Sequence, residues 1–306
     1  MKVLLVLLMT IVLLWGSSRT QVHMGTLIGV NVEDQNLSDE VFFLFSDLDN
    51  RLSTYKADSE ISRLNRDLDL NVSEVTRRVL ERSMEMSRIS NGAFDVTIGS
   101  VTHGAYRFGY DNEHLPSKQQ LQKSEKYVGA HRMKVEGNHV TLLANTIIDL
   151  GGIGKGYAVD LAMDMLQKRG VIRSVVAASG DVGCLGECTI EIQDPFHPSG
   201  HIATITSTLP RLAVSTSGNY ERYIKNKTHN HLIDPKTGIS QQRYASITLI
   251  DTSDNTRIDA LATAVSIMEE NKAIAMLKKL KIAYVFIRND GTMVESEMPK
   301  GVNIRH

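Results

Sequence analysis

The chain has 306 residues, enough for one large domain or two ordinary ones, and 42% of them are hydrophobic against 23% charged. This composition excludes a disordered or fibrous protein. Lys and Arg total 34 and Asp and Glu total 35, so the net charge of −1 provides no general positive field for nucleic acid or an anionic membrane. The only cysteines, Cys184 and Cys188, are too few for a disulfide-framed scaffold or a four-cysteine zinc site, and they leave one short-range disulfide open.

The N-terminus is strongly apolar. After Lys2, residues 3–15 contain Thr10 as their one polar residue, and small residues follow at 16–18. This pattern is typical of an export signal, and the run is shorter than the ~20 residues that a spanning helix needs, although an uncleaved anchor is the alternative. We therefore expect residues 1–18 to be a signal peptide or short hydrophobic leader, and residues 19–306 to be a periplasmic or extracytoplasmic domain, released or tethered to the inner membrane.

Past Thr20, strand-like and helix-like segments are mixed without repeats or a long linker, which predicts one interwoven α+β domain. The expected strands cover residues 24–33, 140–149, 174–178, 189–193, 202–206, 211–214 and 246–250, with a closing hairpin of 282–287 and 292–294. The expected helices cover residues 38–52, 73–89, 158–166, 258–268 and 272–280, and Gly170 is expected to terminate the third. Residues 53–65 are interpreted as a polar loop.

A glycine-rich turn at residues 148–160 is the densest motif, because four glycines separate the end of a predicted strand from the start of a helix. Such a turn exposes backbone N–H groups and suits phosphate binding, but it is equally typical of a tight connection. Two familiar glycine motifs are excluded. A P-loop needs Ser or Thr where this chain has Gly156, and a Rossmann turn needs two residues where only Lys155 separates Gly154 from Gly156.

Asp259 and Thr263 stand four residues apart in a predicted helix, so both oxygens lie on one face. A carboxylate with a hydroxyl suits Mg²⁺, which takes few protein ligands and completes its shell with water and phosphate. The alternative is that Asp259 caps the helix and Thr263 is a small packed residue.

Three further polar clusters are unusual for an ordinary surface. They are the loop with Tyr55, the turn at residues 92–97 with Asp95, and residues 216–238, where His231 precedes an Asp-Pro turn. Each pattern is also compatible with a simple turn or helix cap. His229 and His231 lack the spacing of a zinc protease.

Taken together and in this order, the motifs from Met24 to Thr263 resemble the ApbE family of exported FAD:protein FMN transferases. The resemblance implies an ApbE-like (T-fold-like) single domain of mixed and antiparallel sheets with flanking helices. It also implies Mg²⁺-dependent cleavage of the FAD pyrophosphate, attachment of FMN through a phosphoester to a Thr or Ser of another protein, and release of AMP.

Roles implied by the resemblance fall on matching residues of this chain. FAD contacts are implied for Met24, Tyr55, Ala93, Phe94, Asp95, Asp149 and Lys155, with Tyr55 stacking on a ring of the dinucleotide. Metal ligands are implied for Asp259, Thr263 and the carbonyl of Gly152, and His231 is the implied acid/base or positioning residue. The chain departs from many relatives at Ser179, where they carry glycine before Gly180-Asp181.

Two other functions use the same residues. In the first, water replaces the protein hydroxyl, and the site is an FAD pyrophosphatase that yields FMN and AMP. In the second, the chain is a non-catalytic flavin-binding protein. For the transferase, the expected partner is an exported acceptor flavoprotein domain of a membrane redox complex. No nucleic acid is expected, and membrane association is expected at most through the N-terminal segment.

Overall fold

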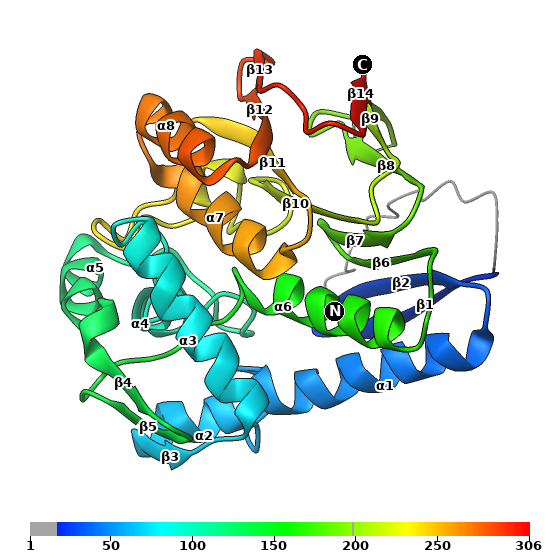
Figure 1. Ribbon diagram of the computed structural model, residues 1–306. Coiled ribbons are helices and arrows are strands. Elements are labelled where there is room, and N and C mark those ends of the chain that lie inside the picture. Colours follow the sequence, from blue (N-terminus) through cyan, green and yellow to red (C-terminus); the bar gives the residue numbers. More distant parts are fainter. Residues whose placement is uncertain (1–16, 198) are drawn as a thin grey trace.

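Helices and antiparallel sheets together build the protein (Figure 1), whose computed structural model describes residues 17–197 and 199–306. The α+β class expected from the sequence is confirmed. The apolar run at residues 3–15 lies outside the described residues, and within the described ones no helix has the length and hydrophobicity to cross a bilayer. The helices are α1 Gln35–Leu52, α2 Glu60–Asp67, α3 Glu74–Ile89, α4 Gly99–Val101, α5 Lys118–Ser124, α6 Gly154–Lys168, α7 Asn255–Ile267 and α8 Glu270–Leu280. The strands are β1 Ser17–His23, β2 Thr26–Val32, β3 Asp69–Asn71, β4 Met133–Glu136, β5 His139–Leu142, β6 Ser174–Ala178, β7 Asp181–Leu185, β8 Cys188–Gln193, β9 His201–Ser207, β10 Arg211–Gly218, β11 Tyr244–Asp251, β12 Ala283–Arg288, β13 Met293–Glu295 and β14 Val302–Arg305.

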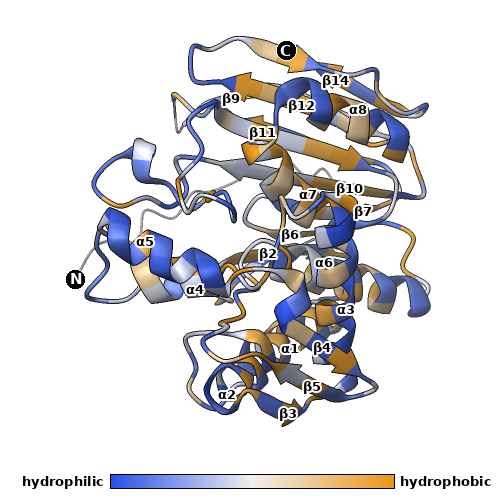
Figure 2. Ribbon diagram, turned by 90° about the vertical axis from the view of Figure 1, so that its left-hand side faces the viewer, coloured by the Kyte–Doolittle hydropathy of each residue, from blue (hydrophilic) through white to orange (hydrophobic). Residues whose placement is uncertain are grey.

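An eight-stranded antiparallel sheet with the order β1-β2-β6-β7-β10-β11-β12-β13 forms the centre of the molecule. Side chains alternate across its strands. In β6, Val176 and Ala178 face the core that includes α6 and α7, whereas Val175 and Ala177 belong to a second core shared with the sheet β14-β9-β8. Figure 2 shows β9 and β14 of the small sheet at the top, α7 beside β10, and α6 below β6. Each of the two cores therefore covers one face of the large sheet.

Two helices of the site region begin at side-chain caps that the sequence carries. The hydroxyl of Ser73 accepts a hydrogen bond from the backbone N–H of Thr76 at the start of α3. At the start of α7, the carboxylate of Asp254 accepts from the N–H of Arg257 at 2.8 Å. Asp259 therefore does not cap this helix and is free for another role.

Several boundaries expected from the sequence are wrong. Helices α6 and α7 begin at Gly154 and Asn255, four and three residues before the expected starts. Helix α1 begins at Gln35 because Asp34 accepts from the N–H of Asn36, three residues before the expected start. The second half of the expected loop 53–65 is helix α2, whose N-cap is Ser59. Strand β5 ends at Leu142, and residues 143–153 are turns and extended chain instead of strand. Side-chain caps determine the starts of α1 and α2. After Leu142 the chain forms an isolated bridge from Ile147 to Ile98 instead of a continuous strand pair.

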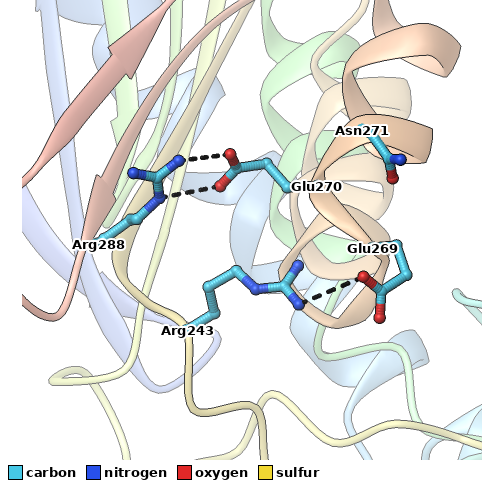
Figure 3. A pocket seen from close by; sticks show the side chains of 5 residues that line it. All are labelled: Arg243, Glu269, Glu270, Asn271 and Arg288. Atoms are coloured by element: carbon cyan, nitrogen blue, oxygen red, sulfur yellow. Dashed lines mark hydrogen bonds and ion pairs between the residues drawn. The ribbon is translucent and has the colours of Figure 1, made fainter.

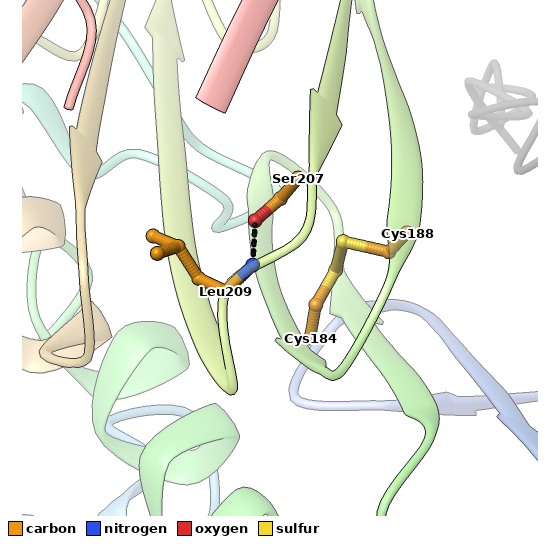
Figure 4. Close-up of a disulfide and its surroundings, with 4 residues drawn as sticks. All are labelled: Cys184, Cys188, Ser207 and Leu209. Atoms are coloured by element: carbon orange, nitrogen blue, oxygen red, sulfur yellow. Dashed lines mark hydrogen bonds between the residues drawn. A yellow bond between two sulfur atoms is a disulfide. The ribbon is translucent and has the colours of Figure 1, made fainter. Parts of the chain in front are cut away.

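A disulfide joins Cys184 at the end of β7 to Cys188 at the start of β8, with a Cα–Cα distance of 6.5 Å (Figure 4). The pairing that the sequence left open is thus present. Both cysteines are buried in the second core. The disulfide links the sheet β14-β9-β8 to the large sheet at the tight connection between β7 and β8.

Reduction of this disulfide is expected to lower the free energy of unfolding by about 2 kcal/mol, the loop-closure value for so short a loop. Urea unfolding of the oxidised and dithiothreitol-reduced protein measures the difference. The double variant Cys184→Ala/Cys188→Ala is the control, since its stability should not respond to dithiothreitol. Equal stability of the two wild-type forms, with free thiols quantified after reduction, would contradict the expectation.

Candidate active site

A buried charge cluster forms where α6, β7 and α7 begin. The ammonium of Lys155 lies 3.0 Å from Oδ2 of Asp181 and 3.8 Å from Oδ1 of Asp259, and both carboxylates are almost fully buried. Burial alone would lower the pKa of Lys155, but the two carboxylates outweigh it and raise this pKa. Burial raises the pKa of Asp259 to about 7, and the charge of Asp181 adds to the effect. With both carboxylates ionised, the cluster holds two negative charges against the one positive charge of Lys155, which favours binding of a cation.

The three residues expected to bind a metal come together beside this cluster. Oδ2 of Asp259 accepts from the N–H of Gly156 at 2.9 Å, which joins α7 to the glycine turn. A Cβ atom at Gly152 would stand 2.8 Å from Oγ1 of Thr263, so the backbone of Gly152 lies directly against that hydroxyl. Across the described ranges, no group of three or more His, Cys, Asp and Glu side chains is arranged for a metal. The expected set relies on one carboxylate, one hydroxyl and one carbonyl instead.

Asp160, which the sequence analysis did not single out, fixes the start of α7. Its carboxylate accepts from the N–H of Asn255 at 3.0 Å and from the N–H of Thr256 at 2.7 Å, and Arg211 contacts it at 3.0 Å. Because Asp160 belongs to α6, these bonds hold the two helices that carry Lys155 and Asp259 in one arrangement.

Asp149 forms a second centre at the beginning of the glycine turn. It accepts from the hydroxyl of Thr102 at 2.6 Å and from the N–H of Gly151 at 2.9 Å, and Nε2 of His103 lies 3.2 Å away. Burial would raise the pKa of Asp149, but His103 and these hydrogen bonds hold it well below its usual range. Thr102 and His103 stand on a single π-helical turn, residues 102–106, which aims both at the carboxylate.

Tyr55 presents an aromatic surface above this second centre. The residue is 49% exposed, and its ring centroid lies 5.4 Å from that of His103 and 5.5 Å from that of Tyr110. Its hydroxyl donates to the carbonyl of Phe108 at 3.1 Å and accepts from Arg222 at 2.7 Å. A planar ligand ring can stack on such an exposed and fixed ring.

The other expected FAD contacts have mixed environments. Phe94 is buried beside Gly152, and the Cε atom of Met24 lies next to Gly154, so both side chains flank the glycine turn. Ala93 is partly buried against the main core. Asp95 is buried, and its carboxylate accepts from the N–H and hydroxyl of Thr97 at 2.9 and 2.6 Å. These hydrogen bonds stabilise the turn that contains Asp95.

His231 stands on the loop between β10 and β11. Its backbone N–H and its ring nitrogen Nδ1 lie 3.1 and 3.2 Å from the carbonyl oxygen of Arg222. Since a carbonyl only accepts, Nδ1 carries the hydrogen and Nε2 keeps its lone pair. Burial lowers the pKa of His231 to about 4, although the hydrogen bond to Arg222 opposes it and the charges of Arg222 and Lys155 assist. The ring is therefore a neutral base at neutral pH.

The turn at Ser179 has a backbone conformation that favours glycine. Ser179 has a φ of +58°, a left-handed conformation that favours glycine, and a Cβ at Gly180 would overlap the carbonyl of Thr216. The tight turn brings Asp181 to Lys155, and the hydroxyl of Ser215 donates to Asp181 at 2.6 Å. Ser179 is thus accommodated in the turn that positions Asp181.

The sequence reasoning missed Thr102, His103, Asp160 and Arg222 and gave no role to Asp181. The one available signal for Asp181 was its place after a strand and a Ser-Gly turn. Asp160 closes the glycine-rich motif of residues 148–160 but received no role there, and Thr102, His103 and Arg222 stand in stretches without a distinctive pattern.

A separate open pocket lies at the start of α8 and contains none of these residues (Figure 3). Arg288 contacts both carboxylate oxygens of Glu270, and Arg243 lies 3.7 Å from Glu269. These lining charges neutralise one another, so the pocket offers no charged group for chemistry.

The similarity of this chain to known proteins extends over the segments described above. A model of the ApbE family matches residues 24–286. The FAD:protein FMN transferase of Haemophilus influenzae is 28% identical over 87% of this chain and 82% of its own length. The FAD:protein FMN transferase of Vibrio cholerae is 28% identical over 92% of each chain.

Solved structures agree in fold. The ApbE protein of Thermotoga maritima superposes with a TM-score of 0.83 at 25% identity, covering 92% of this chain and 97% of the other. The flavin transferase ApbE of Vibrio cholerae superposes with a TM-score of 0.78 at 25% identity, covering 92% and 96%.

Proposed function

This chain belongs to the ApbE family, and from that premise we propose that it is a Mg²⁺-dependent FAD:protein FMN transferase. It is a transferase whose relatives act in flavin transfer. The single observation that carries the proposed site is the convergence of the glycine turn, Lys155 and Asp259 in one buried cluster.

The residues present fit a magnesium ion. Among residues 17–197 and 199–306, Oδ1 of Asp259 has only the distant contact to Lys155, and Thr263 lies one helical turn further on against the backbone of Gly152. Carboxylate, hydroxyl and carbonyl oxygens are the hard donors that Mg²⁺ prefers. When bound, the ion supplies neutralisation of charge on the pyrophosphate.

The chain's own groups would bind and orient FAD. Tyr55 offers the stacking surface, and the turn at Gly151–Gly156 with the uncapped start of α6 offers backbone N–H donors to the phosphates. The ammonium of Lys155 adds positive charge at the same place. Donors fixed before the reaction hold the phosphates in line for attack.

The acceptor hydroxyl needs a base. Its oxygen forms a bond to the phosphorus of the FMN half while the bond to AMP breaks, and its proton passes to Nε2 of His231. The neutral ring and the fixed Nδ1–H tautomer suit this role.

The acceptor we propose is a Thr or Ser on an exported flavoprotein domain of a membrane redox complex, and the chain itself we propose to be exported. The apolar segment at residues 3–15 and the Cys184–Cys188 disulfide support an oxidising extracytoplasmic space. Cell fractionation and N-terminal sequencing test the export. Recovery from the cytoplasm with Met1 and the apolar run intact would contradict it.

The deciding experiment mixes the purified mature chain with FAD, Mg²⁺ and a candidate acceptor domain, and measures the acceptor by mass spectrometry. Addition of the FMN mass with release of AMP is expected. FMN and AMP in solution with an unmodified acceptor would indicate the pyrophosphatase. FAD bound without turnover would indicate a binding protein.

Tyr55→Ala is expected to weaken FAD binding roughly tenfold or less, because aromatic stacking contributes about 1 kcal/mol beyond area burial. Flavin fluorescence quenching measures the affinity. The control Tyr223→Ala removes another exposed tyrosine outside this cluster and should not change it. Unchanged affinity of Tyr55→Ala would remove the stacking role.

A further inference from the structure

Arg222 connects two parts of the site that lie far apart in the sequence. Its backbone carbonyl receives both hydrogen bonds from His231, and its side chain reaches the hydroxyl of Tyr55 at 2.7 Å, 167 residues away. The same residue thus contacts the proposed base and the proposed ring-stacking surface.

The side chain of Arg222 lies among Tyr55, Phe108 and Gly109. The centre of its guanidinium lies 5.7 Å from the ring of Tyr55 and 5.8 Å from the ring of Phe108, both within the range of cation–π attraction. Gly109 lies directly against the guanidinium. It has a φ of +77°, and a Cβ there would overlap the guanidinium. The missing side chain at Gly109 therefore makes the room that Arg222 occupies.

From this geometry we infer that Arg222 is a positioning residue. It fixes the Nδ1–H tautomer of His231 and holds the His231 ring at a set distance from a ligand ring stacked on Tyr55. The inference rests on the proposed function, and it adds a role that neither substrate contact nor metal binding requires. The backbone carbonyl of Arg222 can orient the His231 ring only if Arg222 is itself fixed. The contacts of its side chain with Tyr55, Phe108 and Gly109 fix it. Misplacement of a reacting group by about 1 Å costs on the order of 10²-fold in rate.

Two variants disturb this arrangement from different sides. Arg222→Met keeps the apolar stem and removes the guanidinium. Gly109→Ala leaves Arg222 in the sequence and places a Cβ where its guanidinium lies, 3.0 Å from the hydroxyl of Tyr55. Each is expected to lower kcat of FMN transfer about 10- to 100-fold while FAD affinity changes less than threefold. In a His231→Gln background Arg222→Met should cost little more, because both changes remove the same contribution.

Matched controls exist for both variants. Lys225→Met removes an exposed charge from the same loop. Gly137→Ala imposes the same backbone cost at a φ of +58°, where an added Cβ meets nothing within 4 Å. Both controls should retain wild-type kcat.

A measurement without turnover separates this inference from the proposed function. In ligand-free protein labelled with ¹⁵N-histidine, the ring of His231 should show the Nδ1–H tautomer, and both variants should shift the population toward Nε2–H. If the wild type transfers no FMN, the proposed function fails, and the tautomer result still decides the inference. A large loss of FAD affinity with unchanged kcat, full additivity with His231→Gln, or an unchanged tautomer would overturn it.

Discussion

Replacing Asp259 by asparagine or alanine is expected to abolish Mg²⁺-dependent FMN transfer, a loss of about 10³-fold or more, while the fold is largely retained. Loss of one charged ligand removes several kcal/mol of transition-state stabilisation, and 1.36 kcal/mol is a tenfold change in rate. The fold should survive because Lys155 keeps its closer partner Asp181. Asp259→Asn also keeps an acceptor for the N–H of Gly156.

The rate of transfer against Mg²⁺ concentration, with and without EDTA, checks this expectation. Thr263→Val should lose less activity, because it removes one neutral ligand and keeps the shape. Asp254→Asn is the control, since it alters an acid five residues earlier on the same helix and keeps the N-cap. Wild-type turnover of Asp259→Asn, unaffected by EDTA, would refute the metal assignment.

Replacing His231 by glutamine is expected to lower kcat of transfer about 10²- to 10⁴-fold, the usual contribution of a general base, with FAD affinity unchanged. Burial lowers the pKa of His231 to about 4, so the base is already unprotonated at pH 6. At saturating Mg²⁺, which keeps the carboxylate of Asp259 ionised, the acid limb of the wild-type pH–rate profile should therefore lie near pH 4 instead of near the ordinary value of 6.5.

The same shift predicts a pH effect on stability. Between pH 6.5 and about 4 the unfolded chain binds a proton at His231 that the folded chain does not, so this residue destabilises the fold increasingly as pH falls through that window. His231→Gln should remove that share of the acid sensitivity. His229→Gln, a neighbouring histidine on the same loop, is the control for both measurements. At saturating Mg²⁺, which keeps Asp259 ionised, an acid limb near pH 4 that is unchanged in His231→Gln would exclude His231 as the base.

Several elements follow from the sequence because their causes are local. The cap at Ser73 and the apolar spacing behind it determine α3, and the apolar spacing of residues 158–166 determines the body of α6, although that helix begins earlier, at Gly154. The turn at residues 289–291 specifies the closing hairpin of β12 and β13. The same local signals were insufficient at residues 143–153, where Ile147 forms one isolated bridge with Ile98 instead of a continuous strand pair.

In the site, the sequence by itself determined the chemistry available, since the glycine turn, the Asp259 and Thr263 pair and His231 are recognisable as motifs. Only the tertiary structure decided which groups meet. The antiparallel order β6-β7-β10 brings Asp181 to Lys155, and packing of separate loops brings Arg222 to Tyr55. These contacts depend on strand order and side-chain packing across long sequence separations, for which a linear pattern of residues carries no local signal.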